Sequence, residues 1–318
     1  MLALDVVEDI LLTLDVEDLL RCTSVCKSWY SLISKPYFVK LHLKFIRNKE
    51  DKNNKQLGNR RIYLASNIHN IEGSSNGLVC ISSIENYQIC LTNPSTREFR
   101  ILQDPIILPN SNNAPCYGFG YDSFADDYKL VMAINQGRYD GTLVQILSLK
   151  SNVWKLFGHV NYGFHDSKPG ILFNGALYWF WYNANDIYRK YIMCFDLAKE
   201  EFREIPQPED PRYDVRYSGK LGIFEDHLCI FHARGRPYEM WVMKNYNVKQ
   251  SWELLPTDWA MKERLQCMKK DWRLPPKMPC YFCSDKTLMY LSSWGKYMSD
   301  PIFVQTLVSP YVNDNERP

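Results

Sequence analysis

The segment Ile192-Met-Cys-Phe-Asp-Leu-Ala-Lys-Glu-Glu-Phe202 combines an apolar strand, a polar turn and an aromatic residue that opens a return strand. The same pattern occurs in residues 89–99, 144–154 and 239–252. The aromatic residues that open the four return strands are 55, 48 and 50 residues apart, close to the period of about 50 residues in kelch-type propeller blades. The repeat therefore predicts antiparallel hairpins that stack around a closed ring, which leaves few open strand edges.

A second repeated element supports this interpretation. Short apolar runs at residues 77–81, 176–180, 227–231 and 287–291 each follow a turn-like Asn, Gly or Asp, and we expect them to form inner strands. Residues 61–311 have room for five or six blades at this spacing. A two-sheet sandwich would not require so regular a period. The predicted architecture is a large all-β domain, a five- or six-bladed β-propeller, with a tail at residues 312–318.

The first 45 residues have a different, helical periodicity. Val6, Ile10 and Leu14 are spaced four residues apart, which predicts an amphipathic helix, and Asp15 is suited to cap a second helix. A third helix is expected over residues 25–33, with Pro36 as a stop signal. Helices this short are not stable alone, so they either pack on the next domain or dock a helical partner. Residues 46–60 are almost wholly polar and predict a solvated linker.

Composition excludes several classes of protein. The net charge of +2 over 318 residues provides no field that would attract nucleic acid or an anionic membrane. The longest apolar stretch, near residues 171–182, is interrupted by Asn174 and Gly175, and acidic residues occupy the N-terminus. We expect a soluble protein of the cytoplasm, with the nucleus as an additional compartment. Cys280 and Cys283 form a CxxC without a companion pair, so no metal and no cofactor are expected.

Two motifs resemble catalytic sites. Ser75 lies in Gly73-Ser-Ser-Asn-Gly77, which fits the nucleophile elbow of hydrolases, but this segment leads into a strand where the elbow would lead into a helix. The adjacent Asp126 and Asp127 are typical of a hairpin turn. We therefore expect no enzyme activity. An esterase that uses Ser75 is the catalytic alternative, and a serine-directed probe would label it.

The N-terminal strings Asp5-Val-Val-Glu-Asp-Ile-Leu-Leu-Thr-Leu14, Val16-Glu-Asp-Leu-Leu-Arg21 and Val25-Cys-Lys-Ser-Trp29 resemble an F-box. The resemblance implies docking to the Skp adaptor, which connects F-box proteins to cullin and RING subunits. It also implies that nine residues divide between the helical core and adaptor contact: Leu2, Val6, Ile10, Leu14, Val16, Leu19, Val25, Cys26 and Trp29. The family usually has Pro where this chain has Ala3 and Asp15.

The β region resembles the F-box-associated domain of plant F-box proteins, which is kelch-like. The matching strings include Asn76-Gly-Leu-Val-Cys80, Asn93-Pro-Ser-Thr-Arg97, Gly118-Phe-Gly-Tyr-Asp122 and the closing Val304-Gln-Thr-Leu-Val-Ser-Pro310. The last is similar to S-locus F-box proteins, which act in self-incompatibility, and to their relatives.

This resemblance implies a non-catalytic substrate-recognition subunit of a Skp-cullin-F-box ubiquitin ligase, which binds a target protein for ubiquitination and degradation. The target would be a pistil ribonuclease in the S-locus branch, or an immune receptor in a neighbouring branch. The alternative is an interaction-only protein that does not assemble into a ligase, and adaptor binding separates the two.

Target contacts are expected in loops carried by the rigid sheets. The long loops cover residues 103–116, 182–191, 206–217 and 257–279. Arg, Tyr and Trp side chains commonly anchor protein interfaces. The candidates in or near these loops are Arg212, Tyr213, Arg216, Arg234, Arg236, Trp259 and Trp272.

Overall fold

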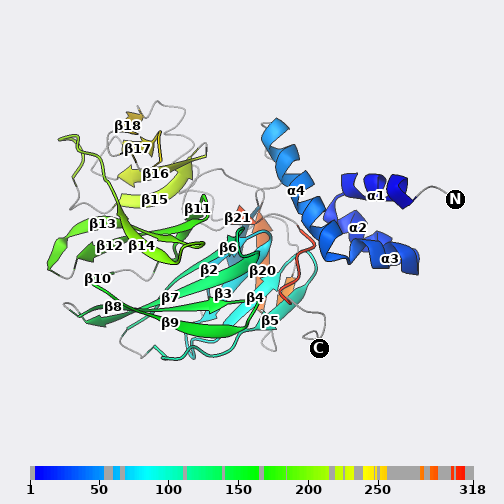
Figure 1. Ribbon diagram of the computed structural model, residues 1–318, viewed down its shortest axis with the longest axis horizontal. Coiled ribbons are helices and arrows are strands. Elements are labelled where there is room, and N and C mark those ends of the chain that lie inside the picture. The colour runs from blue at the N-terminus through cyan, green and yellow to red at the C-terminus, as the bar shows by residue number, and fades with distance from the viewer. Residues whose placement is uncertain are drawn as a thin grey trace.

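The computed structural model places four helices at one end of the molecule and sheets at the other (Figure 1). It describes residues 4–53, 60–64, 69–109, 113–137, 140–164, 168–183, 185–214, 219–224, 226–232, 239–246, 248, 251–255, 280–282, 287–292, 302–303 and 306–311. Within these residues the helices are α1 (Leu4–Thr13), α2 (Val16–Cys22), α3 (Lys27–Ile33) and α4 (Pro36–Asn53).

The three predicted helices are present, and α4 was not expected. The third helix ends at Ile33, before Pro36, as predicted, and Pro36 also occupies the first position of α4. Proline suits that position because its fixed φ is helical and its missing N–H would have no partner there. The start of the predicted 46–60 linker is consequently helical, since α4 continues to Asn53.

The described strands form five antiparallel sheets, numbered here in chain order. The first contains β2 (His69–Ser75), β3 (Leu78–Ser83), β4 (Ile89–Asn93) and β5 (Glu98–Ile101). The second contains β6 (Cys116–Asp122), β7 (Asp127–Gly137), β8 (Gly141–Ser148) and β9 (Val153–Val160). The third contains β10 (Tyr162–Gly163), β11 (Ile171–Phe173), β12 (Ala176–Asn183), β13 (Asp186–Asp196) and β14 (Glu201–Ile205). The fourth contains β15 (Gly219–Phe224), β16 (His227–His232), β17 (Glu239–Met243) and β18 (Trp252–Leu255).

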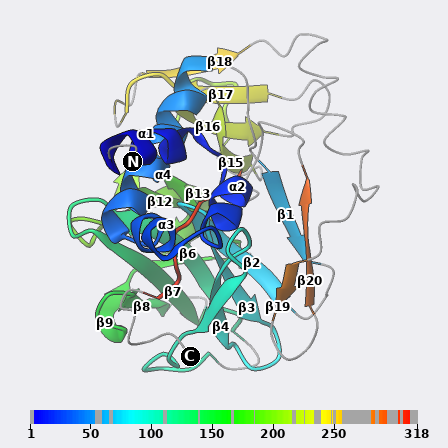
Figure 2. The same cartoon turned by 90° about the vertical axis from the view of Figure 1, so that its right-hand side faces the viewer.

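The fifth sheet combines strands from both ends of the chain. It contains β19 (Cys280–Phe282), β20 (Thr287–Ser292), β1 (Arg60–Leu64) and β21 (Ile302–Phe303). Strand β1 lies between β20 and β21, with Arg61 opposite Ser292 on one side and Arg60 opposite Phe303 on the other. Figure 2 shows β1 beside β20. The early strand therefore completes a sheet that is otherwise made by the last strands.

The sequence repeat corresponds to the hairpins of the sheets. The four repeated segments form β4–β5, β8–β9, β13–β14 and β17–β18, and the short apolar runs form β3, β12, β16 and β20. Antiparallel units of four or five strands, repeated along the chain, are consistent with the arrangement of a β-propeller. The prediction of a small helical region followed by a large all-β region is confirmed.

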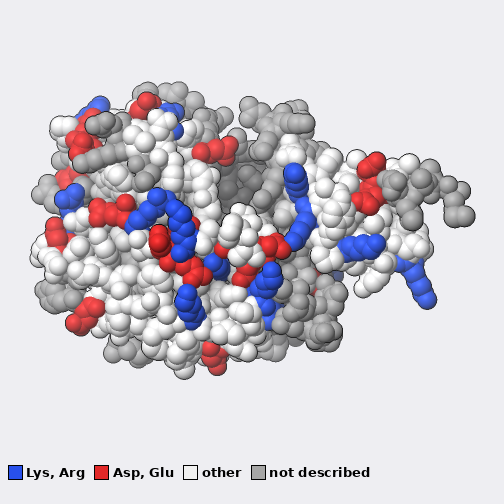
Figure 3. All heavy atoms as spheres, in the orientation of Figure 1, with Lys and Arg blue, Asp and Glu red and all other residues white. Residues whose placement is uncertain are grey.

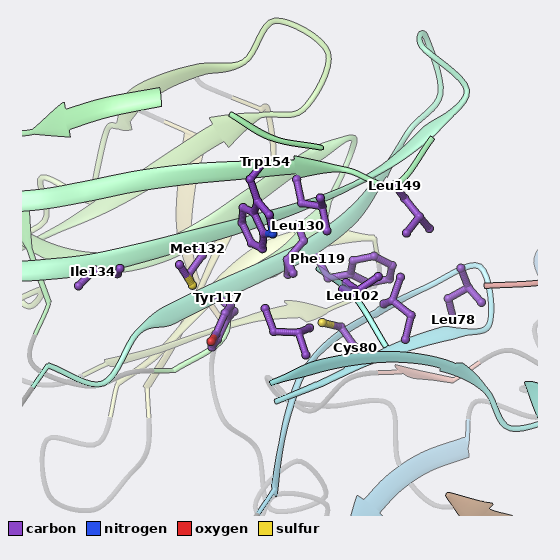
Figure 4. Packing of buried hydrophobic residues seen from close by; sticks show 13 residues of the cluster. Leu78, Cys80, Leu102, Tyr117, Phe119, Leu130, Met132, Ile134, Leu149 and Trp154 are labelled. Carbon is purple, nitrogen blue, oxygen red and sulfur yellow. The ribbon is translucent and has the colours of Figure 1, made fainter. Parts of the chain in front are cut away.

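Hydrophobic clusters between neighbouring sheets form the core. One, between the first and second sheets, includes Leu78, Phe119, Leu130 and Trp154 (Figure 4). A second joins the second and third sheets, and a third joins the third and fourth. The second and third sheets approach so closely at Gly118 that a Cβ atom there would lie 2.5 Å from the Trp179 ring. The absence of a side chain at this position permits the close packing.

Candidate functional site

The start of α2 shows why this short helix forms. The Asp15 carboxylate accepts a hydrogen bond from the Asp18 amide at 2.9 Å, and Asp18 forms an ion pair with Arg21 at 2.8 Å. An N-terminal side-chain acceptor satisfies an amide that the helix itself leaves without a partner. The predicted cap is therefore confirmed, although Asp15 stands where the F-box pattern has Pro.

The four helices surround one small core, called here the helical cluster. Its fully buried members are Leu11, Leu19, Ile33 and Phe38. Partly buried residues pack against it: Val7, Leu12, Leu14, Cys22, Trp29, Leu32 and Leu307. Among the nine predicted adaptor residues, Leu14, Leu19 and Trp29 belong to this cluster, and Val16 is also buried.

Other predicted adaptor residues face solvent. The exposed fractions are 42% for Val6, 51% for Ile10 and 63% for Val25, and Cys26 is also exposed. Val6 and Ile10 lie four residues apart in α1 and share one face. Leu2 lies outside the described residues. The structure thus divides the predicted set into buried residues and an exposed apolar group.

The sequence interpretation missed two exposed tyrosines, Tyr30 and Tyr37. Tyr30 could have been found from its spacing, because Trp29 and Ile33 mark the inward face of α3 and Tyr30 follows one position later. The exposed apolar side chains of this region are Val6, Ile10, Val25, Tyr30, Tyr37 and Phe45. Val6 and Ile10, which share one face of α1, are called the apolar helical face below.

His42 fixes α4 to the end of α1. Its Nε2 lies 2.9 Å from the Leu14 carbonyl oxygen, and its ring stacks on Phe38 at 6.1 Å between centroids. Burial lowers the pKa of His42, an effect that the Leu14 carbonyl and the Asp15 charge oppose only in part. The imidazole therefore has a structural role, and nothing in the sequence pattern around it signalled this role.

Two predicted target-binding residues, Arg212 and Tyr213, lie against the fourth sheet. Arg212 pairs with the Asp210 carboxylate at 2.5 Å and sits over the Trp241 ring, 5.8 Å from its centroid. Tyr213 packs edge-on against Trp241, and burial raises the pKa of its hydroxyl. These two residues are therefore positioned by Trp241. The remaining candidates, Arg216, Arg234, Arg236, Trp259 and Trp272, lie outside the described residues.

The predicted loop at 103–116 presents an apolar surface on a fixed backbone. The buried Gln145 amide accepts a hydrogen bond from the Ile107 N–H and donates one to the Ile107 carbonyl, both at 2.8 Å. Trp154 Nε1 donates to the Gln103 carbonyl at 2.9 Å. Ile106 lies between the two hydrogen-bonded positions, Gln103 and Ile107, and Leu108 follows them; their side chains are 57% and 60% exposed. We call residues 103–109 the anchored loop.

The motifs that resemble catalytic sites serve as turns. Ser75 ends β2 and is buried, and Asn76 and Gly77 then make a tight turn with φ of 51° and 81°. The Asp127 carboxylate accepts from Ser148 Oγ at 2.5 Å and from the Lys150 amide at 2.8 Å. In the described part of the chain, no three His, Cys, Asp or Glu side chains group as metal ligands would.

Charges on the face shown in Figure 3 form a mixed band of both signs within a largely uncharged surface. A separate group of charges, centred on Lys129, is largely buried. Lys129 Nζ lies 3.0 Å from Asp122 and 2.9 Å from Glu200, and it donates to the Leu197 carbonyl at 2.6 Å. Since Asp122 ends β6 and Glu200 lies in the β13–β14 turn, this ammonium ties the second sheet to the third.

The chain thus combines a small helical module with a series of antiparallel sheets, and apolar side chains remain exposed on the helices. Residues 1–41 match the F-box domain, and residues 31–269 match the "F-box associated beta propeller domain". The chain belongs to this family of F-box proteins.

Relatives from Arabidopsis thaliana share this organisation in name. "F-box protein CPR1" is 30% identical, over 78% of this chain and 71% of its own length. "F-box/kelch-repeat protein At3g23880" is 26% identical, over 80% of this chain and 78% of its own length. Within the described residues, no helix has the length and apolarity needed to cross a bilayer.

Proposed function

We propose that this protein is the substrate receptor of a Skp-cullin-F-box ubiquitin ligase. The helices dock the Skp adaptor, which connects the receptor to the cullin and RING subunits, and the β region captures a target protein. The receptor has no catalytic step of its own. Holding target lysines beside the charged conjugating enzyme makes ubiquitin transfer nearly intramolecular, so the contribution of the receptor is effective concentration.

The observation that carries this proposal is the exposure of Val6, Ile10 and Val25 on an F-box whose own core is small. Exposed apolar groups that form a patch mark interaction sites on soluble proteins. We assign adaptor contact to the apolar helical face, Val25 and Cys26. Leu14, Val16, Leu19 and Trp29 are assigned to the helical core, because they are buried or partly buried.

Co-purification with a plant Skp adaptor tests the assignment. Ile10→Asp places a charge on the apolar helical face and is expected to abolish adaptor binding while the chain stays folded. Phe124→Asp is the matched control, since Phe124 is an exposed apolar residue of the β6–β7 turn and is 89% exposed. Equal adaptor binding by wild type, Ile10→Asp and Phe124→Asp would contradict the proposed contact surface.

A second candidate is an interaction-only protein whose F-box does not recruit the ligase. Ala3 favours it, because the F-box pattern has Pro at this position. Failure of the wild-type protein to bind any adaptor of the plant would support this candidate and leave the β region as the source of function.

We also propose that the anchored loop contributes to target binding, together with Arg212 and Tyr213. Two hydrogen-bonded ties hold its backbone, so presenting Ile106 and Leu108 to a partner costs little conformational entropy. The target is a protein with an apolar contact surface, and a pistil ribonuclease and an immune receptor remain the two proposed classes. Arg216, Arg234, Arg236, Trp259 and Trp272 remain candidates from the sequence alone.

The target assignment can be tested in plant cells by comparing ubiquitinated proteins. A double variant, Ile106→Asp with Leu108→Asp, is expected to retain adaptor binding and lose ubiquitination of the targets that wild type modifies. Phe124→Asp again serves as the control. An unchanged set of ubiquitinated proteins in the double variant would remove the anchored loop from the target site.

A further inference from the structure

Residues 306–311, called the C-terminal segment, are hydrogen-bonded to the first sheet. Asn93 Nδ2 donates to the carbonyl oxygens of Thr306 at 2.8 Å and Val308 at 2.7 Å. Thr306 Oγ1 donates to the Asn76 carbonyl at 2.8 Å. Asn93 and Thr306 are both buried, so these bonds are shielded from competing water.

The end of the segment is held by β5. Tyr311 donates its hydroxyl hydrogen to the Phe99 carbonyl at 2.7 Å, and Arg100 Nη1 donates to the Pro310 carbonyl at 3.5 Å. The Arg100 guanidinium also lies over the Tyr311 ring, 6.0 Å from its centroid. The segment is therefore tied to the first sheet along its length.

Two successive side chains of the segment enter different cores. Leu307 packs against the helical cluster formed by α1 to α4, whereas Val308 packs against the cluster between the first and second sheets. Neighbouring side chains of an extended chain point to opposite sides, which allows one short segment to contact both. The C-terminal segment thus links two hydrophobic cores that are otherwise distinct.

A second contact joins the helices to the sheets. Lys40 of α4 pairs with Asp126 in the β6–β7 turn at 2.5 Å, and the Tyr121 hydroxyl also donates to Asp126. The bond from Lys40, followed by that from Tyr121, lowers the pKa of Asp126. Both members of the ion pair are substantially exposed, so this contact supplements the C-terminal segment and does not replace it.

We propose that the C-terminal segment is a clasp that fixes the helices in one orientation relative to the first and second sheets. Leu307 is the helix-side contact, Val308 is the sheet-side contact, and Asn93 holds the backbone between them. If the protein is a ligase receptor as proposed above, the clasp also keeps a bound target at a constant distance and angle from the adaptor. It would thereby select which target lysines reach the conjugating enzyme.

Hydrogen exchange on the full-length protein tests the clasp without any adaptor. Leu307→Ala is expected to speed amide exchange in α1 to α3 by about tenfold or more and to leave the first two sheets unchanged, since local opening follows local packing. Val308→Ala, its immediate neighbour, is expected to have the larger effect in the first and second sheets. Leu307→Met conserves volume and should restore wild-type exchange in the helices.

Asn93 offers an independent variant with a matched control. Asn93 and Asp196 open equivalent turns: Asn93 accepts from the Ser95 amide and Asp196 from the Ala198 amide, but only Asn93 also holds the C-terminal segment among the described contacts. Asn93→Ala is expected to speed exchange in the helices, whereas Asp196→Ala is expected to act on its own turn.

The outcomes separate the clasp from the proposed function. Unchanged helical exchange in both Leu307→Ala and Asn93→Ala, with the sheets still folded by tryptophan fluorescence, would overturn the clasp. Faster helical exchange in both would support it, whatever the adaptor-binding result. Failure of wild type to bind an adaptor would instead count against the ligase receptor alone.

Discussion

The helical and β regions of this chain differ in how completely they bury their apolar side chains. The helical cluster has four fully buried members, and an apolar face remains exposed on the same helices. In the β region, successive clusters between the sheets bury aromatic residues such as Tyr117, Phe195 and Trp241. The β region is therefore built from its own contacts, whereas the helical region depends on contacts from elsewhere in the chain and leaves surface for a partner.

This difference follows from size. A unit of about 50 residues buries a smaller fraction of its surface than a larger domain and is correspondingly marginal. Leu307, from the far end of the sequence, is consequently a meaningful addition to the helical cluster. Removing a buried side chain should therefore lower the free energy of unfolding more in the β region than in the helical region.

The largest effect is expected between the second and third sheets. Phe195 is fully buried, with ring centroids 4.8 Å from Phe202 and 6.0 Å from Phe157. Phe195→Ala should lower the free energy of unfolding by about 3–5 kcal/mol, measured by urea denaturation. Phe124→Ala, on the exposed turn, should change it by less than about 0.5 kcal/mol. Comparable losses in the two variants would contradict the assignment of the core to the sheet interfaces.

The second-largest loss of stability is expected on removal of the buried Lys129 ammonium. Burial alone would raise the pKa of Asp122, but the bond from Lys129 and the amides of Ala125 and Phe124 outweigh it and lower the pKa. Lys129→Ala leaves this buried carboxylate without its cationic partner and should cost about 3 kcal/mol at neutral pH. The loss should shrink in acid, because stability from a lowered carboxylate pKa disappears as pH falls through that pKa.

Lys155 provides the matched control for Lys129. It contacts Glu200 at 2.9 Å, but its side chain is well exposed. Lys155→Ala should therefore cost no more than about 1 kcal/mol. Equal effects of the two lysine substitutions would show that burial does not distinguish them.

A smaller, pH-dependent effect is expected at Glu72. Burial raises the pKa of Glu72 to about 7, although Ser82 Oγ donates to it at 2.5 Å. Its folded-state pKa lies above the unfolded value, so stability is fully present in acid and is lost as pH rises from about 4.5 to about 7. Glu72→Gln should remove this component, which is on the order of 3 kcal/mol. If the free energy of unfolding changed with pH equally in wild type and Glu72→Gln between about pH 4.5 and about pH 8, the assignment of this component to Glu72 would be wrong.

The smallest effect concerns the helical region. Asp15→Ala removes the cap of α2 and should cost about 1 kcal/mol, seen as faster exchange of α2 amides. Asp9 is exposed on α1, and Asp9→Ala should leave those amides unchanged. If the helical region is as marginal as its core indicates, Asp15→Ala should also weaken adaptor binding. Faster exchange of the α2 amides with unchanged adaptor binding would mean that the helical region is more stable than its small core indicates.

Local features of the fold were predictable from the sequence because they depend on neighbours in the chain. The cap at Asp15 and the hairpins after Asn93 and Asp196 follow from side chains that bond to amides two or three residues away. The aromatic repeat likewise reflects packing that recurs in three hairpins, where Trp154, Phe202 and Trp252 join the clusters between the sheets, whereas Phe99 of the first hairpin is exposed. Pro36 correctly marked the end of α3, but its role as the first residue of α4 was missed, because proline can follow one helix and start another.

Features of the candidate site that depend on distant residues were not predictable. Gln145 shows no local sign that its amide will hold Ile107, and Leu307 resembles any strand residue until the helices are placed beside it. The F-box strings supplied the predicted set of adaptor residues. Only the arrangement of the helices separated the exposed Val6 and Ile10 from the buried Leu19.

The position of β1 between β20 and β21 has a consequence for how the chain is made. A ribosome releases β1 long before either neighbouring strand exists, and at about 5–20 residues per second the wait is on the order of tens of seconds. During that time β1 has two unpaired edges, which other nascent chains can join. Production of this protein should therefore depend on chaperones that shield a strand until translation ends.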